Sequence, residues 1–230
     1  MHDFLAGSAY IGILLSLASY FIGVRIQKKL KLAIFNPMLI AIILTIGALL
    51  LLDIDYASYN LSGRYLSYLL TPTTVCLAIP LYRQLQLLKS NLKAILLGIL
   101  SGVLTSLSCV LVLSIIFGLN HAEYVTLLPK SITSAIGMGV AEELGGYPAI
   151  TVPVIVVTGI LGNMFGPGFL KLLRISDPVA KGIAIGTSAH AFGTSRAIQM
   201  GETEGAMSSL SIVVAGIITV VLASVFAQFY

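Results

Sequence analysis

Six stretches of the chain are apolar, contain no charged residue and are long enough to cross a bilayer. This pattern limits the possible folds more than any other feature of the sequence. The stretches run over Ala6–Val24, Ala33–Leu52, Tyr65–Tyr82, Ala94–Leu119, Ala149–Leu170 and Gly205–Tyr230. A helix needs about 20 predominantly apolar residues to span the hydrocarbon core. Only 10% of all residues are charged, against about 25% in a soluble domain. The sequence therefore predicts an all-α polytopic membrane protein with about six full transmembrane helices.

The third of these stretches is the least regular, because Pro72 and Pro80 lie inside it. Proline removes a backbone donor and kinks or breaks a helix. Inside a bilayer, the carbonyls that lose their partners must find others within the protein.

Two further segments, Leu127–Gly146 and Asp177–Met200, are too polar and too rich in glycine for lipid-facing helices. Each contains one apolar portion of about ten residues, which is enough for half a bilayer at about 1.5 Å per residue. We therefore expect two broken or re-entrant segments in addition to the six spans, entering from opposite faces.

The placement of charge predicts the orientation. Basic residues follow the first and third spans, whereas Asp53, Asp55 and Glu123 follow the second and fourth. The positive-inside rule then places the N-terminus outside and the loops 25–32 and 83–93 in the cytoplasm. A third basic loop, with Lys171 and Arg174, also falls inside if Leu127–Gly146 enters and leaves by the same face.

A weak internal repeat supports the same arrangement. The motif TSAIGMG at Thr133–Gly139 is similar to TSRAIQMG at Thr194–Gly201, and each is followed by a long apolar run containing VVTGI or VVAGI. Inverted repeats whose broken helices meet near the midplane are typical of secondary transporters. Chance similarity between two glycine-rich membrane segments is the alternative. We expect one membrane domain over 1–230, with a four-helix part at 1–124 and a two-repeat core at 125–230.

The first polar segment offers groups that suit a carboxylate. Lys130 brings a positive charge, and Ser131, Thr133 and Ser134 bring hydroxyls beside the free N–H groups of a helix start. The alternative is that Lys130 extends to the membrane surface while the hydroxyls satisfy the helix end. Glu142 and Glu143 close the segment and are candidates for proton or cation coupling, unless they lie in a solvated loop.

The second polar segment surrounds His190 with hydroxyls. His190 could carry a proton or donate to a substrate, because histidine titrates near neutral pH; otherwise it forms a structural hydrogen bond. Arg196 could bind an anion through two hydrogen bonds or anchor the segment at the cytoplasmic face. The hydroxyl-bearing candidates of this segment are Thr187, Ser188, Thr194 and Ser195.

Other classes of function find no support in the sequence. Ser188 and His190 are two residues apart and so do not share a helix face, no G-x-S-x-G elbow or H-E-x-x-H motif occurs, and GMG at 137–139 lacks a strand–turn–helix context. Cys76 and Cys109 fit no metal spacing or disulfide framework. We expect neither an enzyme nor a nucleic-acid-binding protein, and no cofactor or metal.

Several longer motifs resemble one known family. LPKSITSAIGM, GGYPAITV, GILGNMFGPGFLKLLRISDPVAKGIAIGTSAHAFGTSRA and GAMSSLSIVVAG are similar to the LrgB/CidB family of bacterial membrane proteins, and TPTTVCLAIPLY in the third span also fits. The resemblance covers nearly the whole chain and is most specific from Leu128 to Gly216. No motif residue is missing, but these residues do not separate LrgB from CidB.

The resemblance implies more than the residues themselves show. Members are called antiholin-like or holin-like and are linked to murein hydrolase control, autolysis and programmed cell death. Related proteins are bacterial pyruvate transporters and the chloroplast glycolate/glycerate translocator. The resemblance thus implies a multi-pass protein of the bacterial plasma membrane, a small LrgA/CidA-type partner, and small monocarboxylates as substrates. A homo-oligomer is also expected.

Two functional hypotheses follow. In the first, the chain carries small monocarboxylates such as pyruvate, lactate or glycolate, coupled to protons. The 129–134 stretch would hold the carboxylate, and His190 with Thr194 would take the hydroxyl or keto end. In the second, it is a holin-like pore or a regulator of murein hydrolase export. The uniformly apolar spans argue against a large pore, but not against a regulatory role.

Overall fold

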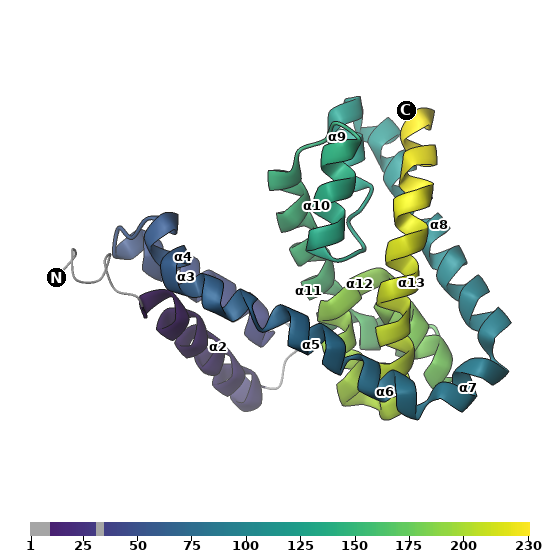
Figure 1. The fold of residues 1–230 in the computed structure, drawn as a ribbon, viewed down its shortest axis with the longest axis horizontal. Coiled ribbons are helices and arrows are strands. Elements are labelled where there is room, and N and C mark those ends of the chain that lie inside the picture. The colour runs from purple at the N-terminus through teal and green to yellow at the C-terminus, as the bar shows by residue number, and fades with distance from the viewer. Residues whose placement is uncertain (1–9, 31–34) are drawn as a thin grey trace. The chain divides into compact units, whose positions relative to one another are not determined.

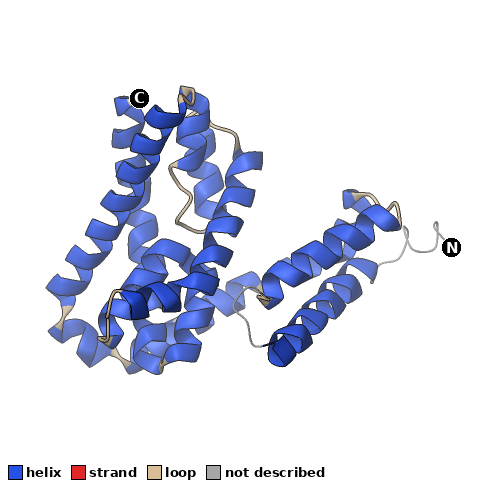
Figure 2. Cartoon of the chain, turned by 180° about the vertical axis from the view of Figure 1, so that it is seen from behind, coloured by secondary structure: helices blue, strands red, loops and turns tan. Residues whose placement is uncertain are grey.

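The computed structural model describes residues 10–30 and 35–230, and its described part is built from helices without strands (Figures 1 and 2). The helices are α2 (Ile11–Leu30), α3 (Pro37–Leu51), α4 (Tyr56–Ser67), α5 (Leu70–Cys76), α6 (Ala78–Arg83), α7 (Leu85–Ser90), α8 (Leu92–Phe117), α9 (His121–Leu127), α10 (Ser134–Glu143), α11 (Pro148–Leu172), α12 (Pro178–Met200) and α13 (Glu202–Phe226), with the 3-10 turn η1 (Ala227–Phe229). The prediction of an all-helical chain is confirmed for these residues. The first few residues of the first two expected spans, 6–9 and 33–34, lie outside them.

Four of the described helices are long and apolar enough to cross a membrane: α2, α8, α11 and α13 with its 3-10 extension. The second expected span, α3, has 15 residues, and the third is divided among α4, α5 and α6. Pro72 and Pro80 each lie in the first turn of their own short helix, α5 and α6. A proline is tolerated there because the first N–H groups of a helix have no intrahelical partner. The described part therefore has four such helices, against six spans expected.

The chain forms two compact units, Met1–Cys76 and Leu77–Tyr230. In the first, α2 packs on α3 and α4. Gly12 lets α2 approach α4 closely, because a Cβ there would lie 2.2 Å from the carbonyl oxygen of Tyr59. The Gly12 N–H donates to Ser62 Oγ at 2.8 Å. Asp55 caps α4, and its hydrogen bonding to Ser58 lowers the pKa of the Asp55 carboxyl.

The second unit is built around α13, which packs against α6, α8 and α12. Its core contains aliphatic residues of α8 together with Tyr124, Val125 and small residues of α13. α8 and α13 run along the length of this unit, and α9 lies with the C-terminus at one end while α6 and α7 lie at the other (Figure 1). The Tyr124 hydroxyl fastens α9 to α13 by donating to the carbonyl oxygen of Phe226 at 2.8 Å.

Helix α12 folds back on itself at His190, whose φ of 40° and ψ of −134° are not helical. Glycines of its first half pack on the start of α13: a Cβ on Gly182 would meet Glu204, and a Cβ on Gly186 would meet Ser208. Its second half returns along the same stretch of α13, where Ile198 packs against Gly205. Both ends of α12 therefore lie at the same end of α13.

The first polar segment makes a comparable turn. α9 leads into a non-helical linker at 128–133, and the chain then runs back through α10 to the end of α9. The return is fixed by Thr126, whose Oγ1 accepts from the N–H of Tyr147 at 2.8 Å and whose carbonyl accepts from Thr151 Oγ1 at 3.0 Å. The linker at 128–133 is therefore the tip of a hairpin made by α9 and α10.

The two tips converge on the first half of α11, at Ile155. Gly137, close to the first tip, lies against the side chain of Ile155. At the second tip, His190 Nε2 lies 3.1 Å from the carbonyl oxygen of the same Ile155. The two tips, at 128–133 and at His190, thus meet at one level of the second unit although the whole of α11 lies between them in sequence.

Candidate ligand-binding site

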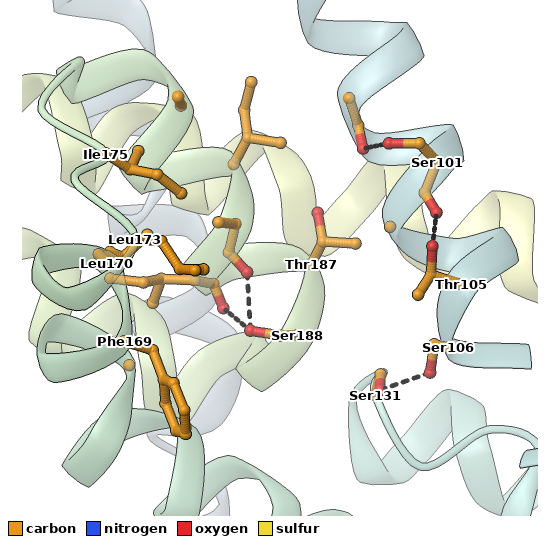
Figure 3. Close-up of a pocket in the computed structure, with 18 of the residues that line it drawn as sticks. Ser101, Thr105, Ser106, Ser131, Phe169, Leu170, Leu173, Ile175, Thr187 and Ser188 are labelled. Carbon is orange, nitrogen blue, oxygen red and sulfur yellow. Dashed lines mark hydrogen bonds between the residues drawn. The ribbon is translucent and has the colours of Figure 1, made fainter. Parts of the chain in front are cut away.

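A cavity of about 1220 Å³ opens between α8, the first tip, α11 and the first half of α12. Hydroxyl side chains line one of its walls: Ser101, Thr105 and Ser106 from α8, with Ser131 from the tip (Figure 3). Phe169, Leu170, Leu173 and Ile175 form an apolar wall opposite, and Thr187 lies between the two walls (Figure 3). The cavity therefore presents a polar wall and an apolar wall to whatever enters it.

Lys130 supplies the positive charge of this cavity. Its Nζ donates to Ser131 Oγ at 3.1 Å, and Ser131 Oγ lies 3.0 Å from Ser106 Oγ. Lys130 lines the cavity and is only partly exposed. An ammonium has three N–H donors, so two remain for an anion after the bond to Ser131. The local chemistry is that of a small anion site.

Three other hydroxyls on the walls already donate their hydrogen atoms to backbone carbonyls. Ser101 Oγ donates to the carbonyl of Gly98 at 2.8 Å, and Thr105 Oγ1 donates to that of Ser101 at 2.7 Å. Ser188 Oγ donates to the carbonyl of Ala184 at 2.7 Å. A hydroxyl has only one donor, so these three face the cavity as acceptors. Donors for an anion are thus concentrated near Lys130.

The structure brings four of the predicted site residues together in this cavity: Lys130, Ser131, Thr187 and Ser188. Thr133 and Ser134 lie at the start of α10, partly buried, and do not line it. Glu142 and Glu143 are exposed at the end of α10.

His190 and Thr194 lie in the packing between α11, α12 and α13 instead of in the cavity. His190 is 2% exposed and bonds to Ile155. Thr194 is 1% exposed; its Oγ1 donates to the carbonyl of His190 at 2.9 Å and lies 2.7 Å from Ser208 Oγ. These contacts fix the break in α12.

Ser195 and Arg196 follow on the returning half of α12. Ser195 Oγ donates to the carbonyl of Phe192 at 2.7 Å and accepts from Asn163 Nδ2 at 3.1 Å, which ties this half to α11. Arg196 Nη1 donates to Gln199 Oε1 at 3.0 Å on the same helix. Neither residue lines the cavity.

The contribution of α8 was missed by sequence reasoning. Ser101, Thr105 and Ser106 lie inside a run that hydropathy marks as a plain span. Small and hydroxyl residues nevertheless recur there at intervals of three or four, as Gly98, Ser101, Gly102, Thr105, Ser106 and Cys109. Residues at this spacing share one face of a helix, and that signal could have identified the polar wall.

Comparison with known proteins shows which family the chain matches. The model of the LrgB-like family matches residues 16–229. The chain is 37% identical over 221 residues to the antiholin-like protein LrgB of Bacillus cereus, covering 96% of each chain. The antiholin-like protein LrgB of Bacillus anthracis matches with the same identity and coverage. No solved structure matches the chain.

Proposed function

Because the chain belongs to the LrgB-like family, we propose that it is an LrgB-type membrane carrier of small monocarboxylates, of the pyruvate, lactate and glycolate class. The observation that carries the proposal is Lys130, a charged side chain held at a cavity inside a largely apolar helical unit. A charge in a membrane protein interior is costly and is usually kept for a functional reason. A carboxylate is the ligand that would neutralise it.

The neighbours of Lys130 support a carboxylate over a bulkier anion. Charge-assisted hydrogen bonds from an ammonium are short and strong, and the Ser106–Ser131 pair can turn one hydroxyl hydrogen toward the same oxygen. The opposite apolar wall would cover the short carbon chain of a small acid. A single anchoring cation also suits an acid with one carboxylate.

The paired hairpins support alternating access as the transport mechanism. Gly159 of the VVTGI motif in α11 lies against His190 of the second hairpin, and Gly216 of VVAGI in α13 lies against Ile136 of the first. Each motif glycine thus receives a residue from the other repeat, as an inverted pair would require. In this proposal the two hairpins are re-entrant from opposite faces, and the core they form with α11 and α13 moves to expose the cavity to each side in turn.

The basic residues support an orientation for this core. Arg83, Lys89 and Lys93 precede or begin α8, while Lys171, Arg174 and Lys181 lie between the end of α11 and the start of α12. Asn91 and Asp177 from these two connections line the same cavity, so both connections lie at one end of the unit. The positive-inside rule would place that end in the cytoplasm, with the N-terminus outside, in a bacterial plasma membrane.

Uptake of labelled pyruvate, lactate and glycolate into proteoliposomes tests the proposal. We expect saturable uptake by the wild type that is lost in Lys130→Gln. Arg196→Gln is the matched control, because it removes one positive charge of the same unit without touching the cavity. Equal uptake by wild type and Lys130→Gln would contradict the site. No uptake, with or without a small LrgA-type partner in the membrane, would contradict the carrier.

The same uptake experiment also tests whether transport is coupled to protons. His190, Glu142 and Glu143 are the candidate coupling groups, and an inward proton gradient is expected to increase the initial rate of uptake. Equal rates with and without the gradient would remove proton coupling while leaving the carrier proposal in place.

The second candidate is an antiholin-like regulator of murein hydrolase activity without carrier function. Its support is the name of the relatives, which are antiholin-like proteins at 37% identity. Release of a trapped dye from the same proteoliposomes, rising with protein density, would favour a pore. Dye retention together with an altered lysis rate in cells and no acid uptake would favour a regulator.

A further inference from the structure

Thr187 lines the cavity and carries a buried hydroxyl. The residue is 5% exposed, and its Oγ1 makes no hydrogen bond to any described residue. It lines the same cavity as Lys130 and Ser131. A buried polar group without a partner costs free energy, and a group bound in the cavity would supply the missing hydrogen bond.

Thr187, which belongs to α12, contacts α8 about one helical turn from the point where Ser131 does, and this places it near the proposed carboxylate site. Its Cγ2 would lie 2.8 Å from a Cβ on Gly102, so the glycine lets Thr187 reach the backbone of α8. Ser131 touches the same helix at Ser106. Four residues along a helix correspond to about 6 Å. Two hydrogen bonds of about 2.8 Å each that lean toward a ligand lying beside this interval can reach two oxygens on neighbouring carbons.

From this geometry we propose that Thr187 is the specificity-determining residue that recognises the oxygen on carbon 2 of the bound acid, while Lys130 and Ser131 hold its carboxylate. This rests on the proposed function. A threonine hydroxyl both donates and accepts, so it serves a 2-oxo acid as a donor and a 2-hydroxy acid as an acceptor. An acid without the second oxygen leaves Thr187 unpaired and binds more weakly.

Lactate and propionate make the sharpest comparison, because they differ only in the 2-hydroxyl. Cys109 lines the cavity and serves as the reporter, and Cys76 is replaced in a Cys76→Ser background. The purified protein is labelled with a maleimide, and the concentration of each acid that halves the labelling rate is measured. In the wild type, lactate is expected to protect at about tenfold lower concentration than propionate, which is the range of one neutral hydrogen bond.

The variants separate the hydroxyl from the rest of the site. Thr187→Val is expected to bring lactate to the level of propionate, and Thr187→Ser to keep the preference. Ser195→Ala is the matched control, because that hydroxyl lies on the same helix but does not line the cavity, and the preference should remain. Thr187→Val should also fold at least as stably as the wild type, since no hydrogen bond of the free protein is lost.

The outcomes also separate this inference from the proposed function. Protection by both acids with equal potency in the wild type, or an unchanged lactate preference in Thr187→Val, overturns the role of Thr187 while acid binding stands. Failure of both acids to protect Cys109 overturns the acid site, and the role of Thr187 with it.

Discussion

His190 reaches from the break in α12 to the first half of α11, where its Nε2 lies 3.1 Å from the carbonyl oxygen of Ile155. The imidazole is 2% exposed and lies edge-on to Phe192. Its backbone φ of 40° is one that side chains rarely adopt. The residue therefore fastens the second hairpin to α11 at a position where the backbone alone would favour glycine.

The two roles of His190 can be separated by a pair of substitutions. His190→Ala is expected to cost about 1–3 kcal/mol of stability, because it removes a buried hydrogen bond and empties the space of the ring. His190→Gly loses the same contacts but relieves the backbone strain, so it should be about 1 kcal/mol more stable than His190→Ala. The midpoints of thermal unfolding in detergent measure the difference. An alanine variant as stable as the wild type would contradict the fastening role.

The contact between α12 and α13 gives a second prediction. A Cβ on Gly186 would lie 2.5 Å from the carbonyl oxygen of Ser208, and backbone atoms cannot move aside easily. Gly186→Ala is therefore expected to lower stability by about 1–3 kcal/mol. Gly139→Ala is the control: no atom lies within 4 Å of its Cβ position, and alanine favours a helix by up to about 1 kcal/mol. Equal unfolding midpoints for the two variants would argue against the close packing.

The charged candidates outside the cavity give a third prediction. Arg196 bonds to Gln199, and Glu142 and Glu143 are exposed at the end of α10. Arg196→Gln should leave the KM for acid uptake within about twofold of wild type, since rim and surface charges contribute little to a site they do not touch. A KM raised tenfold or more would mean that Arg196 does contribute to acid binding.

The orientation of the second unit gives a fourth prediction. If both hairpins are re-entrant, positions 89 and 174 face the cytoplasm and position 142 faces outside. Lys89→Cys, Arg174→Cys and Glu142→Cys, each in a background lacking Cys76 and Cys109, are treated in intact cells with an impermeant maleimide. Only Glu142→Cys is expected to be labelled. Labelling of Arg174→Cys without Lys89→Cys would mean that the first hairpin crosses fully.

The apolar runs predict the helices well, because the free energy of transferring about 20 apolar residues into a bilayer outweighs the local conformational preferences of single residues. α8, α11 and α13 lie where hydropathy places them. The third run departs because Pro72 and Pro80 each lie in the first turn of a new short helix, and hydropathy does not register a lost backbone donor. The turn at His190 was placed in a polar segment, but nothing in residue chemistry identifies histidine as the position that takes a positive φ.

The candidate site was only half visible in the sequence. Charge and hydroxyl content point to Lys130 and Ser131, since such groups are rare among apolar residues. Which hydroxyls face a cavity depends on helix rotation and on partners far along the chain, as the contact of Ser131 with Ser106 shows. His190 is conspicuous in the sequence because of its chemistry. Its partner is the backbone carbonyl of Ile155, and since every residue has such a carbonyl, the sequence could not identify this one.

The committed hydroxyls of Ser101, Thr105 and Ser188 have a consequence for how an anion moves. In the proposed carrier, a carboxylate would meet lone pairs at these three hydroxyls, and it would meet donors at Lys130 and Thr187. The proposed site would therefore bind the acid at one place instead of at a series of weak sites. A conducting pore needs several weak sites in series so that one ion displaces the next. If the chain is the proposed carrier, a single strong site would hold one acid at a time, and release of the acid would require a change in the cavity walls.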